Sequence, residues 1–128
     1  MEQQVYVDRG KQLTEVGVIA DAETYPSALA LLSIHASIAF NDAVLLRLTG
    51  SVGDSGNHQD AARRTEKACK GKKLDYSGVR HLTKLLAAKT DVSYGSRRTT
   101  REQAQTLANA ARSFRTWAYK TLQPQRQE

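Results

Sequence analysis

One long apolar segment, "YPSALALLSIHASIAFNDAVLLRLTG", constrains the fold of this chain more than any other feature. Apolar residues fall on nearly every side of a helix drawn through it, which is typical of a helix surrounded by other helices. Pro26 suits a first turn, where no amide donor is needed, and Gly50 suits a helix end. The sequence therefore predicts a central bundle helix over Tyr25–Thr49.

The polar residues of this segment fall on two faces. At 100° per residue, His35 and Asp42 lie about 20° apart, and Thr49 continues their stripe. Three other polar residues lie on a different face: Ser33, Ser37 and Asn41. We expect one face to meet solvent or a second subunit, and the other to be satisfied by neighbouring helices. His35 is expected to be an ordinary hydrogen-bonded core residue, whereas Asp42 is a candidate site residue.

Helical spacing recurs through the rest of the chain, and no alternation of period two is long enough for a sheet. Further helices are predicted over Gln4–Ala20, from a cap at Asn57 to Gly71, over Tyr76–Ala88, and from a Thr99–Glu102 capping box to Leu122. "KTDVSYGSRR" is expected to be an irregular connection. The predicted fold is an all-α, up-and-down bundle of about five helices, in one domain over 1–128. The prediction of a helical domain is best supported over 24–122, and 123–128 is a polar tail.

Charge is distributed unevenly along the sequence. Up to Ala62 there are three Lys/Arg against eight Asp/Glu (3 − 8 = −5), and from Arg63 onward sixteen against five (16 − 5 = +11), which together give the net charge of +6. A basic second half favours an anionic partner, with complementary packing between subunits as the alternative.

The most plausible phosphate contact lies just before the last predicted helix. Helix N-termini favour anions through free amides and the helix dipole. A tyrosine that can stack on a base lies there among four basic side chains: Lys89, Tyr94, Arg97, Arg98 and Arg101. These residues are the predicted site for RNA or nucleotide.

Candidates for catalysis are few. His58 follows a flexible connection and is a possible acid or base, if the protein is active at all; the alternative is a solvated helix start. The single Cys69 and three scattered histidines predict no metal site, and without a glycine-rich phosphate loop we expect no cofactor. One cysteine and no signal-peptide pattern suit the cytoplasm, and polar residues within the apolar segment argue against a membrane.

From Tyr25 to Leu122 the order of these features resembles a HEPN domain, the small helical bundle of prokaryotic toxin and nucleotide-binding systems. The shared elements are the alanine-rich "ALALLSIHASIAFNDAVLLRLTG", the H-x-x-A of His58 and Ala61, "HLTKLLAAK", the K-x4-Y-x2-RR that begins at Lys89, and a closing alanine-rich helix. The resemblance implies a homodimer, a basic groove near Tyr94 and a nucleotidyltransferase partner.

Active HEPN ribonucleases carry an arginine four to six residues before a histidine. Here Arg47 lies eleven residues before His58, and Arg80 directly precedes His81. The resemblance thus implies a homodimeric binding module for RNA or nucleotide that is non-catalytic or only weakly catalytic. The alternatives are a divergent, metal-independent ribonuclease toxin that uses His58 with Arg97, and a protein-interaction module that binds no nucleic acid.

Overall fold

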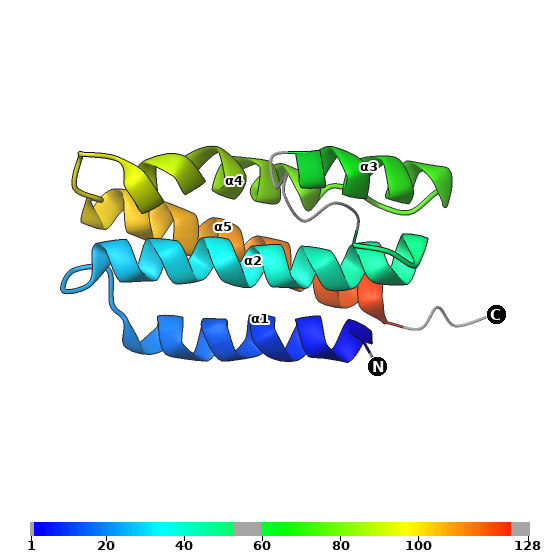
Figure 1. The fold of residues 1–128 in the computed structure, drawn as a ribbon, viewed down its shortest axis with the longest axis horizontal. Helices are drawn as coiled ribbons and strands as arrows, with labels where there is room; N and C mark the ends of the chain where they lie inside the picture. The colour runs from blue at the N-terminus through cyan, green and yellow to red at the C-terminus, as the bar shows by residue number, and fades with distance from the viewer. Residues whose placement is uncertain (1, 53–59, 124–128) are drawn as a thin grey trace.

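The computed structural model describes residues 2–52 and 60–123, which form five α-helices and no β-strand (Figure 1). The helices are α1 (Glu2–Ile19), α2 (Pro26–Thr49), α3 (Ala61–Gly71), α4 (Val79–Tyr94) and α5 (Arg101–Leu122). The all-α helical bundle predicted from the sequence is confirmed.

The central position of α2 is also confirmed, since it packs against each of the other four helices. Pro26 occupies its first turn. Gly50 ends it in the left-handed conformation (φ 78°), with its N–H donating to the Leu46 carbonyl at 2.8 Å. By length and composition α2 could cross a membrane, but 67% of its most apolar window is buried inside the bundle, as in a core helix.

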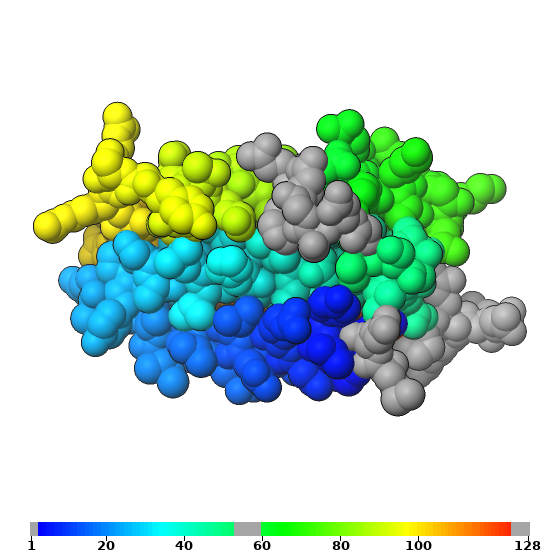
Figure 2. Space-filling model, in the orientation of Figure 1, coloured from blue at the N-terminus to red at the C-terminus, as the bar shows by residue number. Residues whose placement is uncertain are grey.

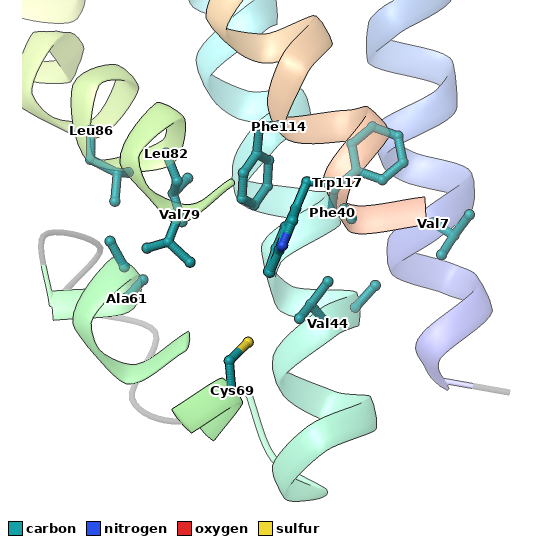
Figure 3. Packing of buried hydrophobic residues seen from close by; sticks show 13 residues of the cluster. Val7, Phe40, Val44, Ala61, Cys69, Val79, Leu82, Leu86, Phe114 and Trp117 are labelled. Atoms are coloured by element: carbon teal, nitrogen blue, oxygen red, sulfur yellow. The ribbon is translucent and has the colours of Figure 1, made fainter. Parts of the chain in front are cut away.

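The core is a cluster to which all five helices contribute (Figure 3). Phe40 of α2, Leu82 of α4 and Phe114 of α5 are almost fully buried within it. The rings of Phe114 and Trp117 lie 5.4 Å apart between their centroids. Burial of these large side chains from separate helices supplies the main driving force that holds the bundle together.

The helices are arranged so that α1 and the α3–α4 pair lie on opposite sides of α2. In Figure 1, α1 runs along the lower edge, and α3 and α4 follow one another along the upper edge. The space-filling view shows α1 as a separate ridge against α2, away from α3 and α4 (Figure 2). Of the helices in the basic second half, α3 and α4 therefore lie apart from α1, whereas α5 packs against α2.

Two helix boundaries differ from the sequence prediction. The fourth helix begins at Val79 and runs on to Tyr94, so the first part of "KTDVSYGSRR" is helical and not irregular. Its late start has a tertiary cause: the Trp117 indole N–H donates to the Asp75 carbonyl at 3.0 Å. The Asp75 carboxylate also accepts from the Ser77 N–H at 3.0 Å, which holds this segment in a turn.

The cap of α5 also differs by one residue. Thr100, not Thr99, is the N-cap: its backbone is extended, and its hydroxyl accepts from the Gln103 N–H at 3.0 Å. Thr99 is buried instead. Threonine recurs at both positions, so the sequence pattern alone could not distinguish them. The predicted cap at Asn57 lies outside the described residues.

Candidate nucleic-acid interface

The third helix presents a row of basic side chains to solvent. Its buried face consists of Ala61, Ala62, Thr65 and Cys69. Arg63, Lys67 and Lys70, spaced by four and three residues, are exposed on the opposite side. Two of the three contact an acid of the same helix or its cap: Arg63 lies 3.3 Å from Asp60, and Lys70 lies 3.3 Å from Glu66. Such solvated pairs are weak and leave the cations available to a polyanion.

The fourth helix continues this row. Its inward residues are Val79, Leu82, Leu85 and Leu86. Arg80 and Lys84 are exposed on the opposite side, one turn apart. We call the five exposed cations of both helices the basic stripe: Arg63, Lys67, Lys70, Arg80 and Lys84. Together α3 and α4 hold 27 residues, which at 1.5 Å per residue gives the two helices a summed length of about 40 Å.

His81 lies beside this stripe, and the charges of the stripe affect the pKa of its imidazole. Partial burial is the main cause that lowers the pKa of its imidazole, and the neighbouring charges of Arg80 and Lys84 lower it further. Like charges disfavour the imidazolium form. Arg80 and Lys84 both lie near His81 on this side of α4.

The predicted site residues lie at the far end of the same helix. Tyr94 is the last residue of α4 and is 84% exposed, and by helical geometry it lies within about 40° of Arg80. Arg97 and Arg98 are exposed in the connection that follows. Arg101, the first residue of α5, is exposed and lies 3.3 Å from Glu102. Lys89 is half-buried on α4.

One acid interrupts this surface. Asp91 is exposed on the same side of α4, between Lys84 and Tyr94. The α4–α5 connection therefore extends the basic stripe with a tyrosine and two arginines, but a single carboxylate separates them from Lys84.

The other two predicted site residues do not join this surface. Asp42 is half-buried on α2, sixteen residues after Pro26, about 24 Å along the helix axis. The α4–α5 connection lies at the opposite end of the bundle, near the start of α2 (Figure 1). Asp42 and Arg97 are therefore not brought together. His58 lies outside the described residues.

The two polar faces predicted for α2 are present. His35 is exposed, so the expectation of a core histidine was wrong; it lies on the stripe that faces outward with Thr49. Asn41, Ser37 and Ser33 are buried. The Thr65 hydroxyl donates to the Asn41 carbonyl oxygen at 2.6 Å, which joins α3 to α2. A neighbouring helix therefore provides the hydrogen-bond partner of Asn41, as the sequence predicted for this face of α2.

The basic stripe itself was not singled out from the sequence, which placed the phosphate site in the connection alone. Its signal is nonetheless present in the spacing of Arg63, Lys67 and Lys70 and of Arg80 and Lys84. Separate helices have no fixed relation in sequence, so only the fold shows that the two rows lie in one layer.

No group of three or more His, Cys, Asp or Glu side chains within residues 2–52 and 60–123 is placed to hold a metal ion. Comparison with protein-family models, with curated proteins and with solved structures gives no match. The resemblance to HEPN domains therefore depends on its sequence motifs alone.

Proposed function

We propose that this protein is a HEPN-like binding module that contacts RNA through the basic stripe and the adjoining α4–α5 connection. The observation that carries the proposal is the outward row of Arg63, Lys67, Lys70, Arg80 and Lys84 over two successive helices. Neutralised phosphates release counterions, which provides most of the affinity of surfaces of this kind.

The shape of the surface favours a polynucleotide over a free nucleotide. A mononucleotide needs a pocket that encloses its base and phosphates, whereas the basic stripe is an open surface that follows two helices. An exposed tyrosine at its end, Tyr94, offers a flat ring on which an unpaired base can stack. Single-stranded RNA has both the extended charge and the free bases that this arrangement fits.

Removal of two stripe cations tests the proposal. We expect Lys67→Ala with Lys84→Ala to weaken binding of a single-stranded RNA oligonucleotide about tenfold at low salt, measured by fluorescence anisotropy. The plot of log affinity against log salt should become shallower by about 1.4, because each lost phosphate contact on a single strand contributes about 0.7.

The matched control is Arg9→Ala with Lys11→Ala, which removes the same charge from exposed positions of α1. This control should keep the affinity within about twofold and the salt slope unchanged, because α1 lies on the other side of α2. Equal weakening in both variants would show a general charge effect and would overturn the assignment to α3 and α4.

The proposal also includes a homodimer and a nucleotidyltransferase partner, as the HEPN resemblance implies. The apolar side chains that α1 leaves exposed support self-association: Val5, Val16, Val18 and Ile19. We expect light scattering to give the mass of a dimer, and Val16→Glu with Ile19→Glu to give a monomer. A monomeric parent protein at about 100 μM would contradict this part of the proposal; specific dimers of standard interface size assemble well below that concentration.

A further inference from the structure

A cleft of about 340 Å³ opens between α1, α2 and α5, away from the basic stripe. Its size lies at the lower end of the range of about 300–1,000 Å³ typical of small-molecule sites. Small residues on all three helices leave the space open, among them Gly17, Ala36, Ala108 and Ala111. α1 packs mainly against α2 and not against α5, which leaves a gap between α1 and α5.

The floor of the cleft is apolar apart from two serines of α2. Leu29, Leu32 and Phe40 line it. The Ser37 hydroxyl is satisfied, since it donates to the Ser33 carbonyl at 2.9 Å. Ser33, one turn earlier on α2, also lines the cleft and is only 7% exposed. The two serines therefore give the otherwise apolar floor a polar edge on α2.

The α5 wall adds two positive charges. Arg112 and Arg115 are one turn apart and both line the cleft, and neither forms an ion pair within residues 2–52 and 60–123. The one acid in the lining is Asp21, whose carboxylate already accepts from the Thr24 N–H at 2.7 Å. Two arginines against one carboxylate leave the lining with a net positive charge.

We propose that the cleft binds a small amphipathic acid, with its carboxylate or phosphate head against Arg112 and Arg115 and its apolar body over Leu29 and Phe40. Guanidinium groups bind both kinds of head group through paired hydrogen bonds, while the arginine stems extend the apolar wall. The Ser33 hydroxyl supplies a polar contact at the floor. This site is independent of the basic stripe, and each can fail without the other.

Calorimetric titration of the full chain with octanoate, octyl phosphate and octanol tests the proposal. We expect saturable one-to-one binding of at least one of the two acids, and binding of octanol at least tenfold weaker. Preference between octanoate and octyl phosphate identifies the head group. Equal binding of octanol, or no saturable binding of either acid, would overturn the proposal.

Two variants locate the site. Arg112→Ala with Arg115→Ala should weaken binding of the acid at least tenfold, whereas Arg80→Ala with Lys84→Ala, which removes the same charge from the basic stripe, should leave it unchanged. Ala108→Leu, which fills the cleft and keeps both arginines, should also abolish binding while circular dichroism stays unchanged. Unchanged binding of the acid in Ala108→Leu would contradict its assignment to the cleft. A dimer in which a second copy closes the cleft would also contradict it.

Discussion

At the scale of single residues, the polar side chains of α2 show how burial selects partners. Asn41 is 1% exposed and Thr65 is fully buried, and their 2.6 Å hydrogen bond joins two helices within an otherwise apolar core. Leaving one buried polar atom without its partner costs more than the bond itself contributes. The pair therefore fixes the register of α3 on α2.

Thr65→Val tests this pair, because valine keeps the shape of threonine and removes the donor. We expect the free energy of unfolding to fall by about 1–3 kcal/mol in urea denaturation, since the Asn41 carbonyl oxygen loses its partner. Asn41→Leu in the same chain should restore part of the loss, because no polar atom then remains unpaired. A loss below about 0.5 kcal/mol in the single variant would show that the bond has no structural role.

His81 gives the RNA proposal a pH dependence of known sign. In the free protein its pKa is lowered by burial and by Arg80 and Lys84. Bound phosphates neutralise those cations and attract the imidazolium, so the pKa rises in the complex and binding takes up a proton. Affinity should therefore increase as the pH falls through the pKa of the complex, and level off below the pKa of the free protein.

We expect this increase to reach at most about fivefold between about pH 7.5 and pH 5.5, as for a charge contact at a solvated surface. His81→Gln, measured by anisotropy across the same range, should remove the dependence. A parent protein whose affinity falls on acidification would contradict the position of His81 beside the bound phosphates.

At the scale of helices, one close contact determines how α4 enters the bundle. A side chain at Gly78, which directly precedes α4, would overlap Trp117 of α5. Glycine is required here because Trp117 packs against the backbone while its indole N–H reaches Asp75. We expect Gly78→Ala to lower the free energy of unfolding by about 1–3 kcal/mol, as for other overpacked core positions.

Gly71→Ala is the matched control for this prediction, because a Cβ atom there meets no other atom within 4 Å. Its unfolding midpoint in urea should stay close to that of the parent. If Gly78→Ala were equally neutral, the contact between Trp117 and the start of α4 would not stabilise the bundle.

The helices themselves could be predicted from the sequence, because each needs only an apolar stripe of helical period and local end signals such as Pro26 and Gly50. The inward leucines of α4 follow from that same rule. The start of α4 could not be predicted, since it depends on the bond between Trp117 and Asp75, which are 42 residues apart. Ends determined by tertiary contacts carry no local signal.

The candidate site could be predicted only in part, because a sequence shows which residues are close along the chain but not which helices pack side by side. Tyr94, Arg97 and Arg98 are close in sequence, so their clustering could be foreseen. The alignment of the α3 and α4 rows, and the cleft beneath Arg112 and Arg115, depend on how helices pack side by side. The exposure of His35 was missed because the apolar residues around it suggested burial on every side.

At the scale of the whole molecule, charge and shape place two different surfaces on the bundle. Helices α3 and α4, which carry the basic stripe, lie on one side of α2, and α1 lies on the other (Figure 1). An approaching polyanion is therefore attracted toward the side that carries α3 and α4. The cleft between α1 and α5 is separate from the basic stripe and suits a small ligand.

A nuclear magnetic resonance titration with single-stranded RNA tests the central claim most directly, because it locates the contact residue by residue. We expect the backbone amide signals of the basic stripe, of Tyr94 and of the α4–α5 connection to shift progressively with added RNA. Those of α1 should remain in place. Shifts concentrated on α1 would contradict RNA binding through the basic stripe. The absence of any shift at low salt would contradict it as well.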